Sequence, residues 1–223
     1  MSRTHQIKGL ILQFIFIVGI GCSQVIRAGD LSFIVTDSKG KIAPNAVITL
    51  RPLIETDWSD LPIEVSVMKQ KLAMFTPFVL AVRANTPVSF PNLDQFRHQV
   101  YSFSKAKQFK LRLYGMDESK KVTFDKAGVV ALGCNIHDNM LAYIYVTDNP
   151  YFTQTNEEGE AVLEDVRSGE YELTVWHPDQ KKRKVSYKAN LIVGKEIDRH
   201  SISIKMRSIR RVQKLADPDG YLG

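Results

Sequence analysis

Short apolar segments separated by turn residues dominate the chain from Asp30 onward, and helical periodicity is almost absent. The run FKLRLY alternates apolar and polar residues, as a half-buried strand does, while VVALGC and MLAYIYV are apolar and β-branched, as strands in a protein core are. Strand signals at regular short spacing, with turn residues between them, are typical of a β-sandwich or barrel. The sequence therefore predicts an all-β protein.

The strand pattern divides into two predicted domains and a tail. The first domain covers residues 29–147, with its central part at residues 85–147, and the second covers residues 148–206. At 223 residues the chain is long enough for two such domains. The last segment, residues 207–223, is predicted to be an exposed tail, either as one helix or without regular structure.

Two parts of the first predicted domain need separate interpretations. Its opening, LSFIVTD followed by SKGK and NAVITLRP, predicts two strands around a glycine turn. Residues 56–75 are less regular, and they are consistent either with one short helix or with a long connection followed by the strand-like piece LAMFTPFVLAV.

The amino-terminal segment has the organisation of an export signal. A basic start is followed by an apolar run over residues 10–20, which is too short to span a membrane as a helix. We predict a signal peptide over residues 1–28 and a periplasmic mature protein. The alternative is a lipoprotein cleaved before Cys22, so contact with the membrane is expected only through the signal or through lipidation at this cysteine.

The charge balance argues against a nucleic-acid ligand. The formal net charge is +6, and it falls to +3 once the signal peptide is removed, because Arg3, Lys8 and Arg27 leave and no acidic residue does. The remaining surface is mixed in sign, and no aromatic residues alternate with basic ones as they do in nucleic-acid-binding surfaces. We therefore predict no nucleic-acid partner.

One group of residues carries recognisable metal chemistry. Cys134, His137 and Met140 lie within the segment GCNIHDNM, between two predicted strands, and His98 lies upstream in NLDQFRHQVYSF. A thiolate, two imidazoles and a weak thioether are the ligands of a blue-copper electron-transfer site. Structural zinc sites use four Cys or His ligands and catalytic ones need an open position, so the methionine argues against zinc. We predict one type 1 copper ion held by these four residues.

These segments resemble the cupredoxin superfamily, and the spacing C-x2-H-x2-M is similar to the short ligand loop of amicyanin. The surrounding stretches VSFPNLDQFRHQVYSFS, KVTFDKAGVVALGCNIHDNMLAYIYV and TNEEGEAVLEDVRSGEYELTVWHP resemble a bacterial family labelled methylamine utilization protein. That resemblance implies a cupredoxin-like (plastocyanin-like) copper domain beside a carboxypeptidase-regulatory-like (transthyretin-like) β-sandwich. It also implies copper binding and electron transfer more firmly than a role in methylamine oxidation.

Some residues near the predicted ligands depart from the family pattern or have two interpretations. Gln99 follows the upstream histidine where cupredoxins commonly have Asn, although its backbone N–H can still reach the cysteine sulfur. Asn92 and Asp94 either hold the ligand loop in place or form an Asx turn between strands. Asp94 is not counted among the metal ligands. His177 is expected to be structural or on the surface.

The predicted function is that of an exported one-electron carrier that cycles between Cu(I) and Cu(II) with redox protein partners, linked to methylamine or other periplasmic oxidation. The alternative is a copper storage, delivery or sensing module without redox cycling. A third interpretation is an adhesive sandwich whose Cys and Met belong to the core. Enzymatic activity is not predicted, because the sequence has no GxSxG, HExxH or Walker motif, and its five histidines cannot supply the clusters of a multicopper enzyme.

Overall fold

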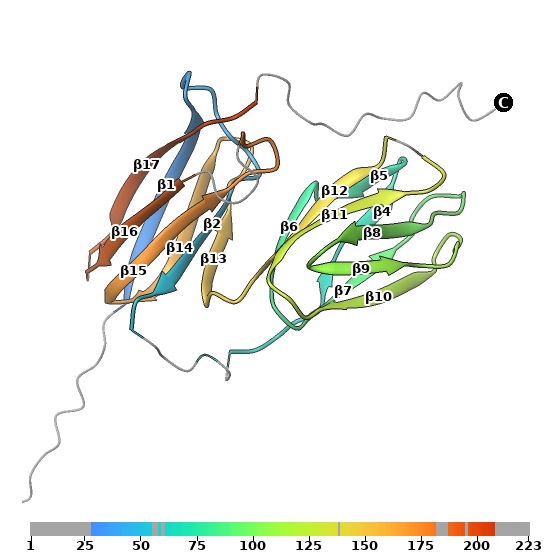
Figure 1. Ribbon diagram of the computed structural model, residues 1–223, viewed down its shortest axis with the longest axis horizontal. Helices are drawn as coiled ribbons and strands as arrows, with labels where there is room; N and C mark the ends of the chain where they lie inside the picture. Colours follow the sequence, from blue (N-terminus) through green and yellow to red (C-terminus); the bar gives the residue numbers. More distant parts are fainter. Residues whose placement is uncertain are drawn as a thin grey trace, which may run out of the picture.

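The computed structural model describes residues 28–54, 58, 61–137, 139–181, 187–194 and 196–207. Their regular structure consists of strands, β1 to β17, arranged in two units that lie side by side (Figure 1). The predicted all-β class is therefore confirmed, and none of these residues forms a helix that could cross a membrane. The predicted signal peptide (residues 1–28, apart from Ala28) and nearly all of the predicted tail (residues 207–223) lie outside the described residues.

The first unit is a sandwich of two sheets built from both ends of the described chain. One sheet has the order β14 (Glu160–Arg167), β1 (Ala28–Asp37), β17 (Asp198–Ile204), and the other has the order β13 (Tyr151–Gln154), β2 (Val47–Pro52), β15 (Gly169–Trp176), β16 (Tyr187–Val193). We call this unit the split sandwich, because the other unit is inserted between β2 and β13. Its core consists of inward-facing apolar residues from both sheets, including Phe33, Leu50 and Leu173.

This arrangement corrects the predicted domain boundary at residue 29. The glycine turn is present at Gly40, with φ of 78°, but the strands on either side of it enter different sheets. β1 pairs with β14 and β17, and β2 pairs with β13 and β15, so residues 28–52 fold with the predicted second domain. Each strand buries its apolar face against the opposite sheet, and the local sequence pattern does not specify which distant strand will be its neighbour.

The second unit, which we call the inserted sandwich, covers residues 66–147. Its smaller sheet has the order β10 (Ser119–Phe124), β7 (Thr86–Pro91), β3 (Ser66–Val67), and its larger sheet has the order β6 (Val79–Arg83), β12 (Leu141–Thr147), β11 (Gly128–Cys134), β8 (Val100–Ser104), β9 (Lys107–Lys110). A hairpin of β4 (Lys69–Lys71) and β5 (Met74–Thr76) completes it. β5 and β6 thus fall in the strand-like piece LAMFTPFVLAV, whereas β3 and β4 are short strands where a helix or a connection was expected.

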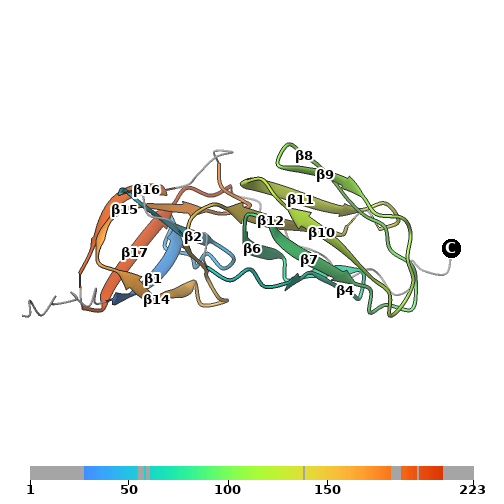
Figure 2. The ribbon, with the colours of Figure 1, turned by 90° about the horizontal axis from the view of Figure 1, so that it is seen from below.

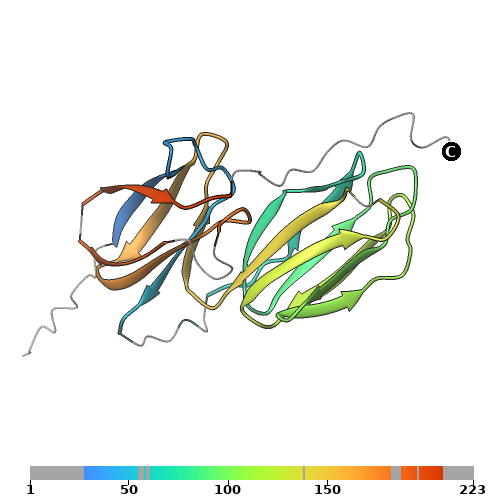
Figure 3. The same ribbon diagram turned by 45° about the horizontal axis from the view of Figure 1, so that its top comes forward.

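The two sheets of the inserted sandwich face each other (Figure 3). Aromatic side chains make up much of the core between them. Phe90 of β7 lies 6.5 Å from Phe124 of β10 and 6.0 Å from Phe109 of β9, measured between ring centroids. Leu132 and Ile144, on β11 and β12, are fully or almost fully buried in the same cluster. The core begins at Met68, so the predicted central part at residues 85–147 was drawn too narrowly.

The two sandwiches meet through the outer faces of one sheet from each. Figure 2 shows β2 and β15 of the split sandwich beside β6 and β12 of the inserted sandwich. On these strands, Val47 and Trp176 form a buried cluster with Val79 and Tyr143. The Trp176 ring lies 5.9 Å from the Tyr143 ring and 5.2 Å from the Tyr145 ring. Because β12 begins directly after Met140, this contact supports the strand that follows the predicted ligand loop.

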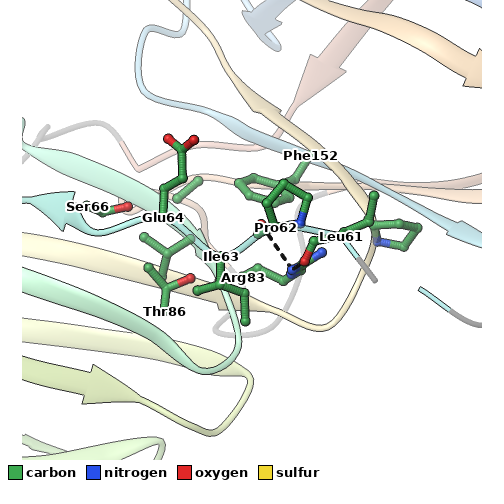
Figure 4. A pocket seen from close by; sticks show the side chains of 11 residues that line it. Leu61, Pro62, Ile63, Glu64, Ser66, Arg83, Thr86 and Phe152 are labelled. Carbon is green, nitrogen blue, oxygen red and sulfur yellow. Dashed lines mark hydrogen bonds between the residues drawn. The ribbon is translucent and has the colours of Figure 1, made fainter. Parts of the chain in front are cut away.

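A cleft of about 340 Å³ lies beside this junction and is lined by residues from both sandwiches and from the segment between β2 and β3 (Figure 4). The Arg83 guanidinium donates hydrogen bonds to the carbonyl oxygens of Leu61 and Pro62, the second at 3.2 Å. Phe152 of β13 lines the opposite wall. Arg83 therefore fastens the connecting segment to the inserted sandwich.

We expect Trp176→Ala to lower the free energy of unfolding by about 3–5 kcal/mol, because a large aromatic side chain with 3% exposure would leave a cavity between the sandwiches. Chemical denaturation followed by circular dichroism measures the change. Phe103→Ala is the control, since Phe103 is 77% exposed and its loss should cost less than about 0.5 kcal/mol. Equal effects of the two variants would contradict the described interface.

Candidate metal centre

His98 is held rigidly between β7 and β8. Its backbone N–H donates to the Tyr114 carbonyl at 3.0 Å, and the Tyr114 N–H donates to the His98 carbonyl at 3.1 Å. The side chain is 0% exposed. Phe96 packs against the ring, with 5.1 Å between the two centroids. The backbone of His98 is therefore fixed by two hydrogen bonds, and its imidazole packs against an aromatic ring.

Cys134 and His137 come from the loop between β11 and β12, at the ends of these strands that lie away from the split sandwich (Figure 1). Cys134 is the last residue of β11 and pairs with Val100 of β8, so the strand that follows His98 also positions the cysteine. The Met140 N–H donates to the His137 carbonyl at 3.1 Å and closes the loop. Met140 is buried in the same apolar cluster as Cys134.

The structure brings three of the four predicted ligand residues together at the distances that one metal ion requires. The Cys134 Sγ lies 3.7 Å from Nδ1 of His98 and 3.9 Å from Nδ1 of His137. One ligand atom from each residue lies within 4.8 Å of the others. Ligands that are about 2.0–2.3 Å from one ion are about 3.5 Å from each other, so this spacing fits a shared metal.

The donor chemistry of this group fits copper. Thiolate sulfur suits Cu(I), imidazole suits copper in both oxidation states, and a long methionine contact is typical of blue-copper sites. Phe96 also packs on His137, with 5.2 Å between centroids, and the surroundings of Cys134 are apolar. His98, Cys134 and His137 would hold the ion, and Met140 is placed in the same loop as the predicted fourth ligand.

The Cys134 thiol ionises more readily than an ordinary thiol, because its pKa is lowered. Burial alone would raise its pKa, but hydrogen bonds from His98, from the backbone N–H groups of Gln99 and Ile136, and from His137 outweigh burial and lower the pKa to about 6. The bond from the Gln99 backbone agrees with the expectation that this residue retains the N–H contact to sulfur. Thiolate is the form of cysteine that binds metals.

The pKa of His98 shifts in the opposite direction. Burial would lower its pKa, but the contacts with Cys134 and Asp94 outweigh burial and raise the pKa. The thiol of Cys134 and the imidazole of His98 are therefore a coupled acid–base pair, in which the negative sulfur and the positive ring stabilise each other.

Asp94 is the functional residue that the sequence pattern did not assign to the site. Its carboxylate accepts a hydrogen bond from Nε2 of His98 at 2.8 Å, on the side of the ring opposite to Cys134. The Asx turn is confirmed, because the Asp94 N–H bonds to the Asn92 side chain at 2.9 Å. The contact of Asp94 that bears on the site is with His98, and not with the Cys134–Met140 loop that it was expected to hold. The spacing of Asp94 and His98 is the only sequence signal for this contact.

His177 has a structural role, which is one of the two roles expected for it. His177 is buried in the split sandwich, where its Nδ1 accepts a hydrogen bond from the Asp179 N–H at 3.0 Å. Its Nε2 then donates to the Pro44 carbonyl at 2.9 Å. Both ring nitrogens have partners, so His177 connects two loops of the sandwich.

We expect the metal-free protein to retain a Cys134 thiolate down to about pH 6, whereas an ordinary thiol loses it below about pH 8.5. Because the folded-state pKa is lowered, the thiolate is present above the transition and is lost as the pH falls through it. Thiolate absorbance in the ultraviolet measures the midpoint, with Cys134→Ala as the blank. A midpoint near that of a free thiol would contradict the hydrogen-bonding geometry.

The solved structures to which the chain is similar match less than half of it in each case named here. No protein-family model and no curated protein matches it. Among solved structures, a purple cupredoxin from Nitrosopumilus maritimus is 17% identical, with a TM-score of 0.34, over 37% of this chain and 99% of that one. A reduced Cu(I) variant of amicyanin is 16% identical, with a TM-score of 0.36, over 45% of this chain and 98% of that one.

A third similar structure is a Cu-containing nitrite reductase from Thermus scotoductus, which is 25% identical, with a TM-score of 0.37, over 44% of this chain and 25% of that one. Because the TM-scores and the identities are low, the assignment of the metal centre rests on its own residues, their distances and their burial.

Proposed function

We propose that this protein is an exported type 1 copper protein that carries single electrons. The observation that carries the proposal is the buried Cys134 sulfur with two imidazole nitrogens close to it, Nδ1 of His98 at 3.7 Å and Nδ1 of His137 at 3.9 Å. Bound copper would supply the one-electron redox chemistry, and His98, Cys134, His137 and Met140 would be its ligands. The resemblance of the surrounding segments supports membership of the cupredoxin superfamily and, more narrowly, of the methylamine utilization protein family.

The residues of the chain would favour fast electron transfer by limiting rearrangement. His98 is fixed by backbone hydrogen bonds, and Cys134 is at the end of a paired strand. The sulfur ionises readily, so metal binding displaces a proton from a group whose pKa is already lowered. Ligands that hold the same positions in both oxidation states keep the cost of reorganisation low.

Electrons would enter and leave through His137. This residue is partly exposed, whereas the side chain of His98 is 0% exposed, so a partner can approach His137 but not His98. Redox proteins of the periplasm are the proposed partners, and no nucleic-acid or enzymatic role is proposed. The split sandwich, proposed to be carboxypeptidase-regulatory-like, would serve as a support that packs on β6 and β12.

Cyclic voltammetry of the copper-loaded protein tests this proposal. We expect a reversible one-electron wave that survives many cycles without loss of metal. The competing function, copper storage or delivery, predicts rapid transfer of Cu(I) to a chelator and no stable wave. That outcome would overturn the electron-carrier proposal.

A further inference from the structure

We propose that Asp94 is a positioning residue that fixes the imidazole of His98 and lowers the reduction potential of the copper centre. The first part of the proposal concerns the protein alone, and the second rests on the proposed function. Asp94 is 6% exposed, and its carboxylate accepts hydrogen bonds from His98 Nε2 at 2.8 Å, from the Leu72 N–H at 2.6 Å and from the Ala73 N–H at 3.1 Å.

The two backbone donors come from an unusual turn. Leu72 and Ala73 form the two-residue turn between β4 and β5, and both have left-handed backbone conformations, with φ of 56° and 51°. Such turns normally use Asn and Gly, because side chains with a Cβ are disfavoured there. Neither N–H is used in the pairing of β4 with β5, so both can donate to the Asp94 carboxylate. The turn is thereby held against the loop that carries His98.

The carboxylate determines which nitrogen of His98 carries a proton. An ionised carboxylate can only accept hydrogen bonds, so Nε2 of His98 must be the donor. When the imidazole is neutral, as it must be to bind a metal ion, this leaves a lone pair on Nδ1, the nitrogen 3.7 Å from the Cys134 sulfur. Carboxylates that bond to metal-binding histidines in this way fix the tautomer and the ring orientation, and they increase the basicity of the ligand.

The charge of Asp94 has a second consequence. Oxidised copper carries one more positive charge than reduced copper, and a buried negative charge nearby favours the oxidised form. The interaction is weakly screened, because the side chains of His98 and Asp94 are both almost fully buried. Asp94 should therefore lower the reduction potential, and neutralising it should raise the potential.

Spectroelectrochemical titration of three variants tests the effect on potential. Asp94→Asn should reduce the ratio of Cu(II) affinity to Cu(I) affinity by about 10-fold to 100-fold. Each tenfold decrease in this ratio raises the reduction potential by about 59 mV for a one-electron couple. Asp94→Glu keeps the negative charge, so its reduction potential should stay closer to that of the wild type. Asp125→Asn removes an exposed negative charge of the inserted sandwich, which is paired with Lys107, and it should leave the reduction potential almost unchanged.

A purely structural role for Asp94 predicts something different: lower stability of Asp94→Asn with the same potential as the wild type. That result, or an equal shift in Asp125→Asn, would overturn the proposed charge effect.

A second measurement needs neither copper nor a variant. In ¹⁵N NMR spectra of the metal-free wild-type protein, Nε2 of His98 should carry a proton, because it faces the Asp94 carboxylate at 2.8 Å. An unprotonated Nε2 would overturn the positioning role, even if the protein proved to be a type 1 copper protein. Failure of the proposed function, in turn, would remove the predicted potential shift and leave this NMR result as the test of Asp94.

Discussion

A chain that lacks residues 28–52 should lose the split sandwich while the inserted sandwich stays folded. The deletion removes β1 and β2, which are interior strands of their sheets. It also removes Leu31, Phe33, Ile48 and Leu50 from the core. Each such side chain contributes about 1.5–3 kcal/mol when buried, so their loss is comparable with the whole stability of a typical domain, about 5–15 kcal/mol.

The inserted sandwich has all of its strand partners within residues 66–147, together with the four proposed ligands. A chain of residues 61–150 is therefore expected to fold and to retain the Cys134 thiolate with its lowered pKa. Circular dichroism and the dispersion of NMR signals measure folding in both chains. A folded split sandwich after deletion of residues 28–52, or an unfolded 61–150 chain, would contradict the described topology.

The second large effect separates the two histidines of the metal centre. His98→Gly and His137→Gly should each weaken copper binding by more than about 100-fold, because loss of even an outer partner of a ligand costs about 10-fold to 100-fold. Added imidazole should restore the spectrum of His137→Gly, since His137 is partly exposed. It should not restore His98→Gly, because the side chain of His98 is 0% exposed and a free imidazole has no route to its position.

Absorbance titrations with copper, with and without imidazole, measure this contrast. His177→Gly is a control for the loss of a histidine that bonds to Pro44 and Asp179 in the split sandwich, and it should bind copper as the wild type does. If added imidazole restored the spectrum of His98→Gly but not that of His137→Gly, the proposed assignment of His98 as the buried ligand and His137 as the exposed ligand would be wrong.

The all-β class of the fold and the closeness of Cys134 to His137 were predictable, because both depend on local patterns. Alternation in segments such as FKLRLY identifies strands, and the close spacing of Cys134, His137 and Met140 reflects a single loop. The partner strands of β1 were not predictable in this way. They lie more than a hundred residues away, at β14 and β17, and apolar alternation in β1 fits any sheet that covers one of its faces.

The contact between Asp94 and the turn at Leu72 and Ala73 was also beyond the sequence. Turn residues are usually found through Gly, Asn or Asp, and this turn has none of them. Its left-handed backbone is stabilised by a carboxylate about twenty residues further along the chain. The interaction depends on the packing of the hairpin of β4 and β5 against the loop before β8, which no local pattern encodes.

Titration of the metal-free protein with Cu(II), followed by visible absorption and EPR, tests the central claim most directly. Cys134→Ala is the matched control. One equivalent of copper is expected to give an intense thiolate-to-copper band with a small EPR hyperfine splitting, and both should be absent from the variant. A pale spectrum with a large hyperfine splitting, or a spectrum that Cys134→Ala leaves unchanged, would contradict a type 1 copper centre at His98, Cys134 and His137.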